Sequence, residues 1–123
     1  MDHVLIVNDN DAFRSILKQV LLSRFPSMHI SEAQDGDSAM EKIEEQSPDV
    51  ILMDVRLPGE GGFQLTRRIK AAHSKIAIII FTSYDSPEYR EAAFDSGADY
   101  FFSKTSSTAM DVLEKVDSIL SSP

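Results

Sequence analysis

Four polar residues stand where apolar runs of the sequence end, and their types suit a site that binds a cation and then an anion. They are Asp9, Asp54, Thr82 and Lys104. Asp and Lys are among the residue types least often buried, yet these follow runs that are typical of buried strands. Each residue alone has an ordinary explanation, such as a helix cap or a solvated loop charge. Together, at the ends of neighbouring strands, they indicate one functional site.

The segment after the first apolar run, Asn8 to Asp11, argues against a nucleotide or flavin site. Nucleotide binders place Gly-rich or Ser/Thr-rich loops after the first strand, so that backbone N–H groups reach phosphate. The acidic segment would repel an anion instead. Carboxylate, amide and backbone carbonyl oxygens, together with waters, are the ligands that Mg²⁺ prefers. A cation between Asp9 and Asp54 would neutralise both carboxylates, and phosphate could then approach.

Composition limits the class of protein. The chain has 123 residues with a net charge of -8, enough for one domain with one core. The densest basic cluster is Arg67, Arg68 and Lys70, so direct binding of nucleic acid is not expected. No apolar run spans a bilayer and no signal peptide is recognisable, which predicts a cytoplasmic protein without a membrane segment. There is no cysteine, and the three histidines are scattered, so thiolate and histidine metal sites are not expected.

Five apolar runs that read as strands alternate with five segments of helical apolar spacing. The predicted strands are Val4–Val7, His29–Ala33, Asp49–Asp54, Ile76–Phe81 and Tyr100–Phe102. In the first predicted helix the inward stripe is Phe13, Ile16, Leu17, Val20 and Leu21. Asp37 is the predicted N-cap of the second helix, and Pro87 suits the first turn of the fourth.

This alternation predicts an α/β fold. Strands that alternate with helices pair in parallel through right-handed crossovers, with helices on both faces of one sheet. The prediction is one doubly wound (βα)5 domain over residues 1–123. A flavodoxin-like strand order 2-1-3-4-5 is a common solution, although the pattern alone does not determine the order. Ligands bind at the carboxyl ends of such strands, and Asp9, Asp54, Thr82 and Lys104 would all lie there.

Four motifs follow one another along the chain: VNDND at 7–11, VILMDVRLPG at 50–59, IIFTS at 79–83 and GADYFFSK at 97–104. Together, over the whole length, they resemble the receiver domains of bacterial two-component response regulators, the CheY-like family. The resemblance implies a regulatory phosphoacceptor rather than an enzyme with a separate substrate. It implies that Asp54 accepts phosphate from a histidine kinase, and that Asp9 and the backbone carbonyl of Arg56 hold Mg²⁺. It also implies that Thr82 and Lys104 bind the phosphoryl oxygens.

Three positions depart from the family pattern. Asn8 stands where the family usually has an Asp, which removes one charge beside the metal and leaves an amide that could act through a water. Thr105 follows Lys104 where the family usually has a proline after a cis bond, and such a bond to another residue costs about 2.5 to 4 kcal/mol. Phe101, at the switch position, has no hydroxyl to satisfy, so burial is favoured. We therefore predict a domain biased toward the active arrangement before phosphorylation.

The resemblance also implies partners and an output surface. The phosphodonor would be a histidine kinase or a phosphotransfer protein. Output to a downstream protein or effector domain, or through a phosphorylation-dependent homodimer, would use the face of the fourth helix, fifth strand and last helix. Thr82 would move toward the phosphoryl group and Phe101 would turn into the vacated space. Arg56 and Tyr84 are large and cannot orient water as a carboxylate or amide would, so slow self-dephosphorylation is expected.

Two alternatives stay open. A pseudo-receiver would no longer take phosphate and would serve only as a protein-binding module, which Asn8 makes conceivable. Retention of Asp54, Thr82 and Lys104 favours the phosphorylated switch. A phosphohydrolase that forms an aspartyl-phosphate would need a second acid, most simply two residues after the nucleophile. Arg56 stands at that place, which disfavours this alternative.

Overall fold

Five strands and five helices alternate in the computed structural model, which describes residues 2–121. The strands are β1 His3–Val7, β2 His29–Ala33, β3 Val50–Met53, β4 Ala77–Thr82 and β5 Tyr100–Ser103. The helices are α1 Asp11–Arg24, α2 Gly36–Glu45, α3 Gly62–Ala72, α4 Pro87–Asp95 and α5 Ala109–Ser121. All strands pair in parallel in the order β2-β1-β3-β4-β5. The predicted fold class and strand order are confirmed.

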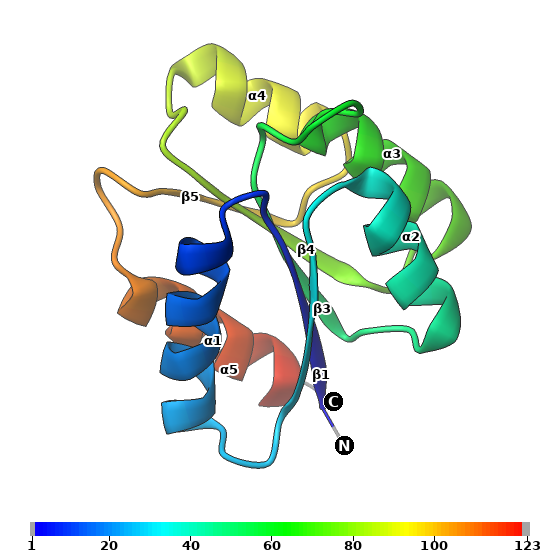
Figure 1. Cartoon of the computed structure of the whole chain (residues 1–123). Coiled ribbons are helices and arrows are strands. Elements are labelled where there is room, and N and C mark those ends of the chain that lie inside the picture. Colours follow the sequence, from blue (N-terminus) through cyan, green and yellow to red (C-terminus); the bar gives the residue numbers. More distant parts are fainter. Residues whose placement is uncertain (1, 122–123) are drawn as a thin grey trace.

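The sheet is covered on both faces. Helices α1 and α5 lie on one face, and α2, α3 and α4 lie on the other (Figure 1). Successive strand residues point to opposite faces, so Leu5 and Ile51 pack with α2 to α4, whereas Ile6 and Leu52 pack with α1 and α5. All residues of β1 and β3 are buried. This double burial explains why their sequences are apolar without alternation.

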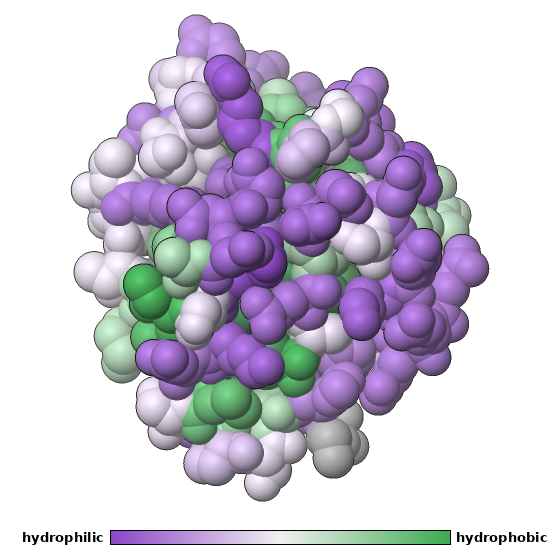
Figure 2. Space-filling model, viewed as in Figure 1, coloured by the Kyte–Doolittle hydropathy of each residue, from purple (hydrophilic) through white to green (hydrophobic). Residues whose placement is uncertain are grey.

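Two local predictions about helices are wrong. Asp37 lies inside the first turn of α2, and the cap is Asp35, whose side chain accepts the Ser38 N–H at 2.8 Å. Ile16 is 59% exposed rather than buried, because the apolar stripe of α1 is wider than the surface that the sheet and α5 cover. It lines a surface groove with Phe13 and neighbouring residues. Figure 2 shows a largely polar surface with apolar patches where α1 lies. Within residues 2–121, no helix is long and apolar enough to cross a bilayer.

A buried histidine lies at the end of the sheet opposite the strand carboxyl ends. His3 is 3% exposed and is the register partner of His29 in β2. Its Nε2 contacts the Ser31 hydroxyl, and the rings of His3 and His29 have centroids 4.4 Å apart. Burial, and next the nearby His29, lower the pKa of His3 below its usual 6.5, against smaller opposing effects of a backbone hydrogen bond at Ser47 and of Asp49.

We predict that this histidine destabilises the folded state as the pH falls. Because the pKa of His3 is lower in the folded chain than in the unfolded chain, the unfolded chain takes up the proton first. The stability associated with neutral His3 is therefore present above pH 6.5 and is lost as the pH falls through the folded pKa. Urea unfolding from about pH 7.5 down to about pH 5 should show a shallower loss in His3→Gln than in the wild type. His73→Gln is the control, and equal slopes in His3→Gln and the wild type would contradict this assignment.

Candidate functional site

The phosphoacceptor candidate lies at the carboxyl edge of the sheet. Since Val7 pairs with Met53 across β1 and β3, the next residues, Asn8 and Asp54, emerge side by side. The Asp54 N–H donates to the Val7 carbonyl at 3.1 Å. The Asp54 Oδ1 accepts the Val55 N–H at 2.7 Å, and the side chain is 13% exposed. The backbone thus orients this carboxylate, and its Oδ2 faces the neighbouring side chains.

Lys104 reaches the same carboxylate from the end of β5. Thr82 pairs with Ser103, and the Lys104 N–H donates to the Thr82 carbonyl at 2.8 Å. The Lys104 Nζ lies 3.5 Å from Asp54 Oδ2. It also lies 3.9 Å from the centroid of the Phe13 ring, whose face attracts a cation. Three of the residues that the sequence singled out, Asp54, Thr82 and Lys104, are therefore brought to one edge.

Asn8 is adjacent to Asp54 and presents its nitrogen. It is 4% exposed, and its Nδ2 donates to Asp54 Oδ2 at 3.2 Å. Its Oδ1 is engaged with the turn, where it accepts the Asn10 N–H at 2.9 Å. Asn8 therefore acts in this arrangement as a neutral hydrogen-bond donor to the acceptor carboxylate. A carboxylate at the same place would repel Asp54.

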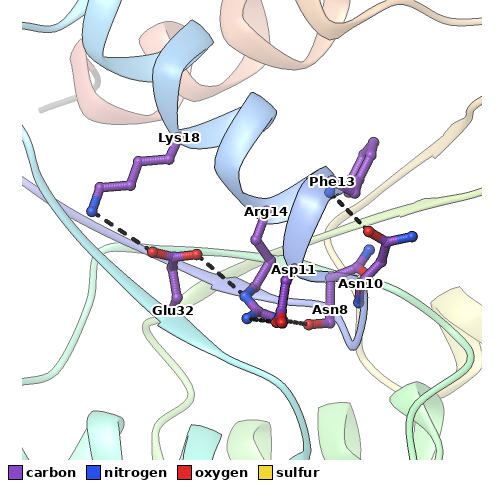
Figure 3. Close-up of polar contacts among 7 residues, drawn as sticks. All are labelled: Asn8, Asn10, Asp11, Phe13, Arg14, Lys18 and Glu32. Atoms are coloured by element: carbon purple, nitrogen blue, oxygen red, sulfur yellow. Dashed lines mark hydrogen bonds and ion pairs between the residues drawn. The ribbon is translucent and has the colours of Figure 1, made fainter.

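Arg14 is part of this corner and was missed from the sequence. Its side chain, 12% exposed, donates to the Asn8 carbonyl, pairs with Asp11, and has its Nε 3.2 Å from Glu32 Oε1 (Figure 3). Lys18 approaches the other oxygen of Glu32 at 3.7 Å. The Arg14 guanidinium thus links the turn after β1 with α1 and β2 through hydrogen bonds and ion pairs. Only the i, i+3 spacing of Asp11 and Arg14 is visible in the sequence.

The oxygen donors at this corner fit a divalent cation. Asp9 is exposed and follows Asn8, which contacts the partly buried Asp54, and Asp11 is paired with Arg14. Among residues 2–121, no group of three or more His, Cys, Asp or Glu side chains could hold a metal. Carbonyl oxygens and waters would have to complete the ligand set, which suits Mg²⁺ rather than a transition metal.

Arg56 and Tyr84 contact one another at the rim of the site. The Arg56 guanidinium lies 4.6 Å from the centroid of the Tyr84 ring. That ring also packs on Tyr89, with centroids 5.5 Å apart. The Tyr84 N–H donates to Thr82 Oγ1 at 3.3 Å, and Thr82 is fully buried. The two predicted modulators of dephosphorylation thus form one cation–π contact between the loops after β3 and β4.

Phe101 is buried, as its lack of a hydroxyl predicts. It is 6% exposed and belongs to the core that faces α2, α3 and α4. Arg90, from α4, lies with its guanidinium carbon 4.8 Å from the ring centroid. The Phe101 ring therefore lies in the core between β5 and α4.

The geometry of this site agrees with the comparisons between this chain and known proteins. The model of the response regulator receiver domain matches residues 4–117, and the chain belongs to this family. It is 30% identical over 104 residues to response regulator GacA of Pseudomonas viridiflava, covering 85% of this chain and 49% of that protein. It is 37% identical over 103 residues to the gliding motility regulatory protein of Myxococcus xanthus, covering 82% of this chain and 13% of that protein.

A solved structure of a receiver domain also resembles this chain. The CheY-like response regulator receiver domain protein from Methanospirillum hungatei matches with a TM-score of 0.87 at 28% identity, over 98% of this chain and 94% of that one. The chain spans about half the length, or less, of the curated relatives described above. Receiver domains are regulatory modules, so the chain is a signalling domain of the two-component type.

Proposed function

We propose that Asp54 is the phosphoacceptor of this domain and takes a phosphoryl group from a histidine kinase or a phosphotransfer protein. One observation carries the proposal: the Asp54 carboxylate is oriented by the Val55 N–H and lies 3.5 Å from the Lys104 ammonium. A carboxylate oxygen of Asp54 attacks phosphorus while the bond between phosphorus and the donor's leaving atom breaks. The mixed anhydride that forms changes the charge at the carboxyl edge of the sheet.

The neighbouring residues have separate roles in this step. Lys104 balances the charge of the phosphoryl oxygens. Thr82 already accepts the Tyr84 N–H, so its own hydroxyl proton is free to donate to a phosphoryl oxygen. Asp9, Asp54 and the backbone carbonyl of Arg56 would hold Mg²⁺, which when bound neutralises the charge shared by carboxylates and phosphate.

The test is incubation with acetyl phosphate and Mg²⁺, followed by intact mass spectrometry. We expect one added phosphoryl group, and much less of it when the Mg²⁺ is chelated. A chain that stays unmodified at saturating donor and Mg²⁺ would instead favour the protein-binding pseudo-receiver.

The output proposal concerns residues 1–123 as one cytoplasmic receiver domain. The α4, β5 and α5 face would contact a downstream protein or effector domain, or a second copy after phosphorylation. Burial of Phe101 beneath Arg90 supports a resting domain biased toward the active arrangement. Phosphorylation then has to shift only a small remaining free-energy difference between two states.

Asn8→Asp is predicted to tighten Mg²⁺ binding by about tenfold, because a third carboxylate is added within a few ångströms of the cation. The same carboxylate would face Asp54 without a donor, so the metal-free variant should melt at a lower temperature than the wild type. Calorimetric titration with Mg²⁺ measures the affinity. Asn10→Asp, the same chemical change at an exposed residue two positions away, is the control. An equal gain in both variants, or no gain in either, would show that Asn8 is not beside the metal.

Tyr84→Ala is predicted to speed the loss of phosphate severalfold. The proposed reason is that the ring, with the Arg56 guanidinium 4.6 Å from its centroid, shields the acceptor, so that its removal admits the attacking water. The measurement is the decay of the phosphorylated mass after removal of the donor. Tyr84→Phe keeps the ring and should decay as the wild type does. A wild-type rate in Tyr84→Ala would reject shielding.

A further inference from the structure

Both neighbours of Lys104 bind one carboxylate from a different loop. Asp85 Oδ2 accepts the Thr105 hydroxyl at 2.6 Å and the Ser103 hydroxyl at 2.8 Å. The two hydroxyl oxygens lie 2.7 Å apart, and the Thr105 N–H donates to Ser103 Oγ at 3.1 Å. We name Asp85, Ser103 and Thr105 the loop clamp. Two of its members, Ser103 and Thr105, are the residues on either side of Lys104 in the sequence.

The loop clamp connects two segments that both serve the site. Asp85 lies in the loop after β4, three residues beyond Thr82, and Ser103 ends β5. Ser103 is 2% exposed, so its hydroxyl is fixed by the interior, whereas Asp85 and Thr105 lie at the surface. The Thr105 and Ser103 hydroxyls lower the pKa of Asp85, which keeps this carboxylate charged and accepting at neutral pH.

Because residue 105 is a threonine, no proline ring restrains the backbone after Lys104. No peptide bond in residues 2–121 is cis, so the bond between Lys104 and Thr105 is trans. Thr105 also has no ring to limit its φ angle, as a proline would. Hydrogen bonds must therefore supply the order of this loop, and the two to Asp85 have a charged acceptor, the stronger kind.

We propose that Asp85 is a positioning residue for phosphoryl transfer, which acts through Ser103 and Thr105 to hold Lys104 beside Asp54. The inference rests on the function proposed above for Asp54 and Lys104. Lys104 Nζ is only 3.5 Å from Asp54 Oδ2, and a displacement of about 1 Å at a reacting centre can cost up to about 100-fold in rate. Without the carboxylate, the loop after β5 gains freedom and Nζ leaves this distance for part of the time.

The experiment compares Asp85→Ala with Asp95→Ala, which removes an exposed carboxylate at the end of α4. A second pair compares Thr105→Val, which removes the hydroxyl with little change in shape, with Thr105→Ser, which keeps it. Two quantities are measured on the full chain: the rate of acyl phosphate formation from acetyl phosphate with Mg²⁺, and the NMR shift of the Lys104 ammonium nitrogen without donor. Thermal melts of all variants report on folding.

We expect Asp85→Ala and Thr105→Val to slow acyl phosphate formation by about tenfold and to move the Lys104 nitrogen shift. Asp95→Ala and Thr105→Ser should match the wild type in both measurements. Wild-type rate and wild-type shift in Asp85→Ala would overturn the loop clamp while the proposed function stands. A lower melting temperature with an unchanged Lys104 shift would assign Asp85 to loop stability alone and also overturn it.

The two proposals fail in different ways. If the wild type forms no acyl phosphate, the function proposed for Asp54 is wrong. The Lys104 nitrogen shift then still decides whether the loop clamp holds this side chain, because that measurement needs no phosphodonor.

Discussion

Asp54→Asn is expected to abolish the Mg²⁺-dependent addition of a phosphoryl group. The amide cannot act as the attacking carboxylate, and it brings no charge to a divalent cation. The substitution keeps the shape of the side chain, and its amide oxygen can still accept the Val55 N–H that Asp54 Oδ1 accepts at 2.7 Å. Loss of modification would therefore report on chemistry rather than on folding. Intact mass after treatment with acetyl phosphate measures it.

Asp37→Asn is the matched control for this loss. Asp37 is an exposed carboxylate in the first turn of α2 that has no role in the proposed site, and its variant should be phosphorylated as the wild type is. A phosphoryl group that persists in Asp54→Asn and maps by peptide mass to another carboxylate would refute the assignment of Asp54. Loss of modification in both variants would point to an effect of charge alone.

Gly62→Ala is expected to destabilise the domain by about 3 kcal/mol or more, at the upper end of what overpacking costs. A Cβ on Gly62 would lie 2.2 Å from the Asp54 carbonyl oxygen, 3.0 Å from Val55 Cα and 3.1 Å from the Asp54 carbonyl carbon. All three are backbone atoms, so no side chain can rotate away. The Gly62 N–H also donates to the Val55 carbonyl at 2.8 Å. The start of α3 is thus packed directly on the segment that carries the phosphoacceptor.

Gly61→Ala is the control, because its Cβ would meet only the Val55 carbonyl oxygen at 3.8 Å, an ordinary contact. Gly61 has φ -72° and ψ 163°, which alanine adopts without strain. Urea unfolding should place this variant within about 0.5 kcal/mol of the wild type. Equal stability of the two alanine variants would contradict the close packing of Gly62 on the backbone of Asp54 and Val55. Phosphorylation of folded Gly62→Ala should also be slowed, since any relief must displace Asp54.

The contacts of Asp54 differ in how far the sequence predicts them. Asp54 and Lys104 are 50 residues apart, and their meeting follows from the parallel sheet that the apolar runs predict. The presence of Asn8 beside Asp54 depends in addition on the pairing of β1 with β3, which the apolar pattern alone does not determine. The direction of its amide does not follow. It depends on the turn at Asn10, which occupies the amide oxygen and leaves the nitrogen toward Asp54.

The apolar pattern of the sequence is enough to predict the element order, the α/β class and the strand ends where the site lies. Each of these depends on whether a residue is buried within its own strand or helix, and the apolar period reports that directly. Three features depend on how the chain packs: the exposure of Ile16, the contact of Arg14 with Glu32 and the hydrogen bond of Ser103 to Asp85. Arg14 and Glu32, like Asp85 and Ser103, are 18 residues apart. Such polar pairs leave no periodic pattern in the sequence. They depend on where the packed core positions the loops and the helix ends.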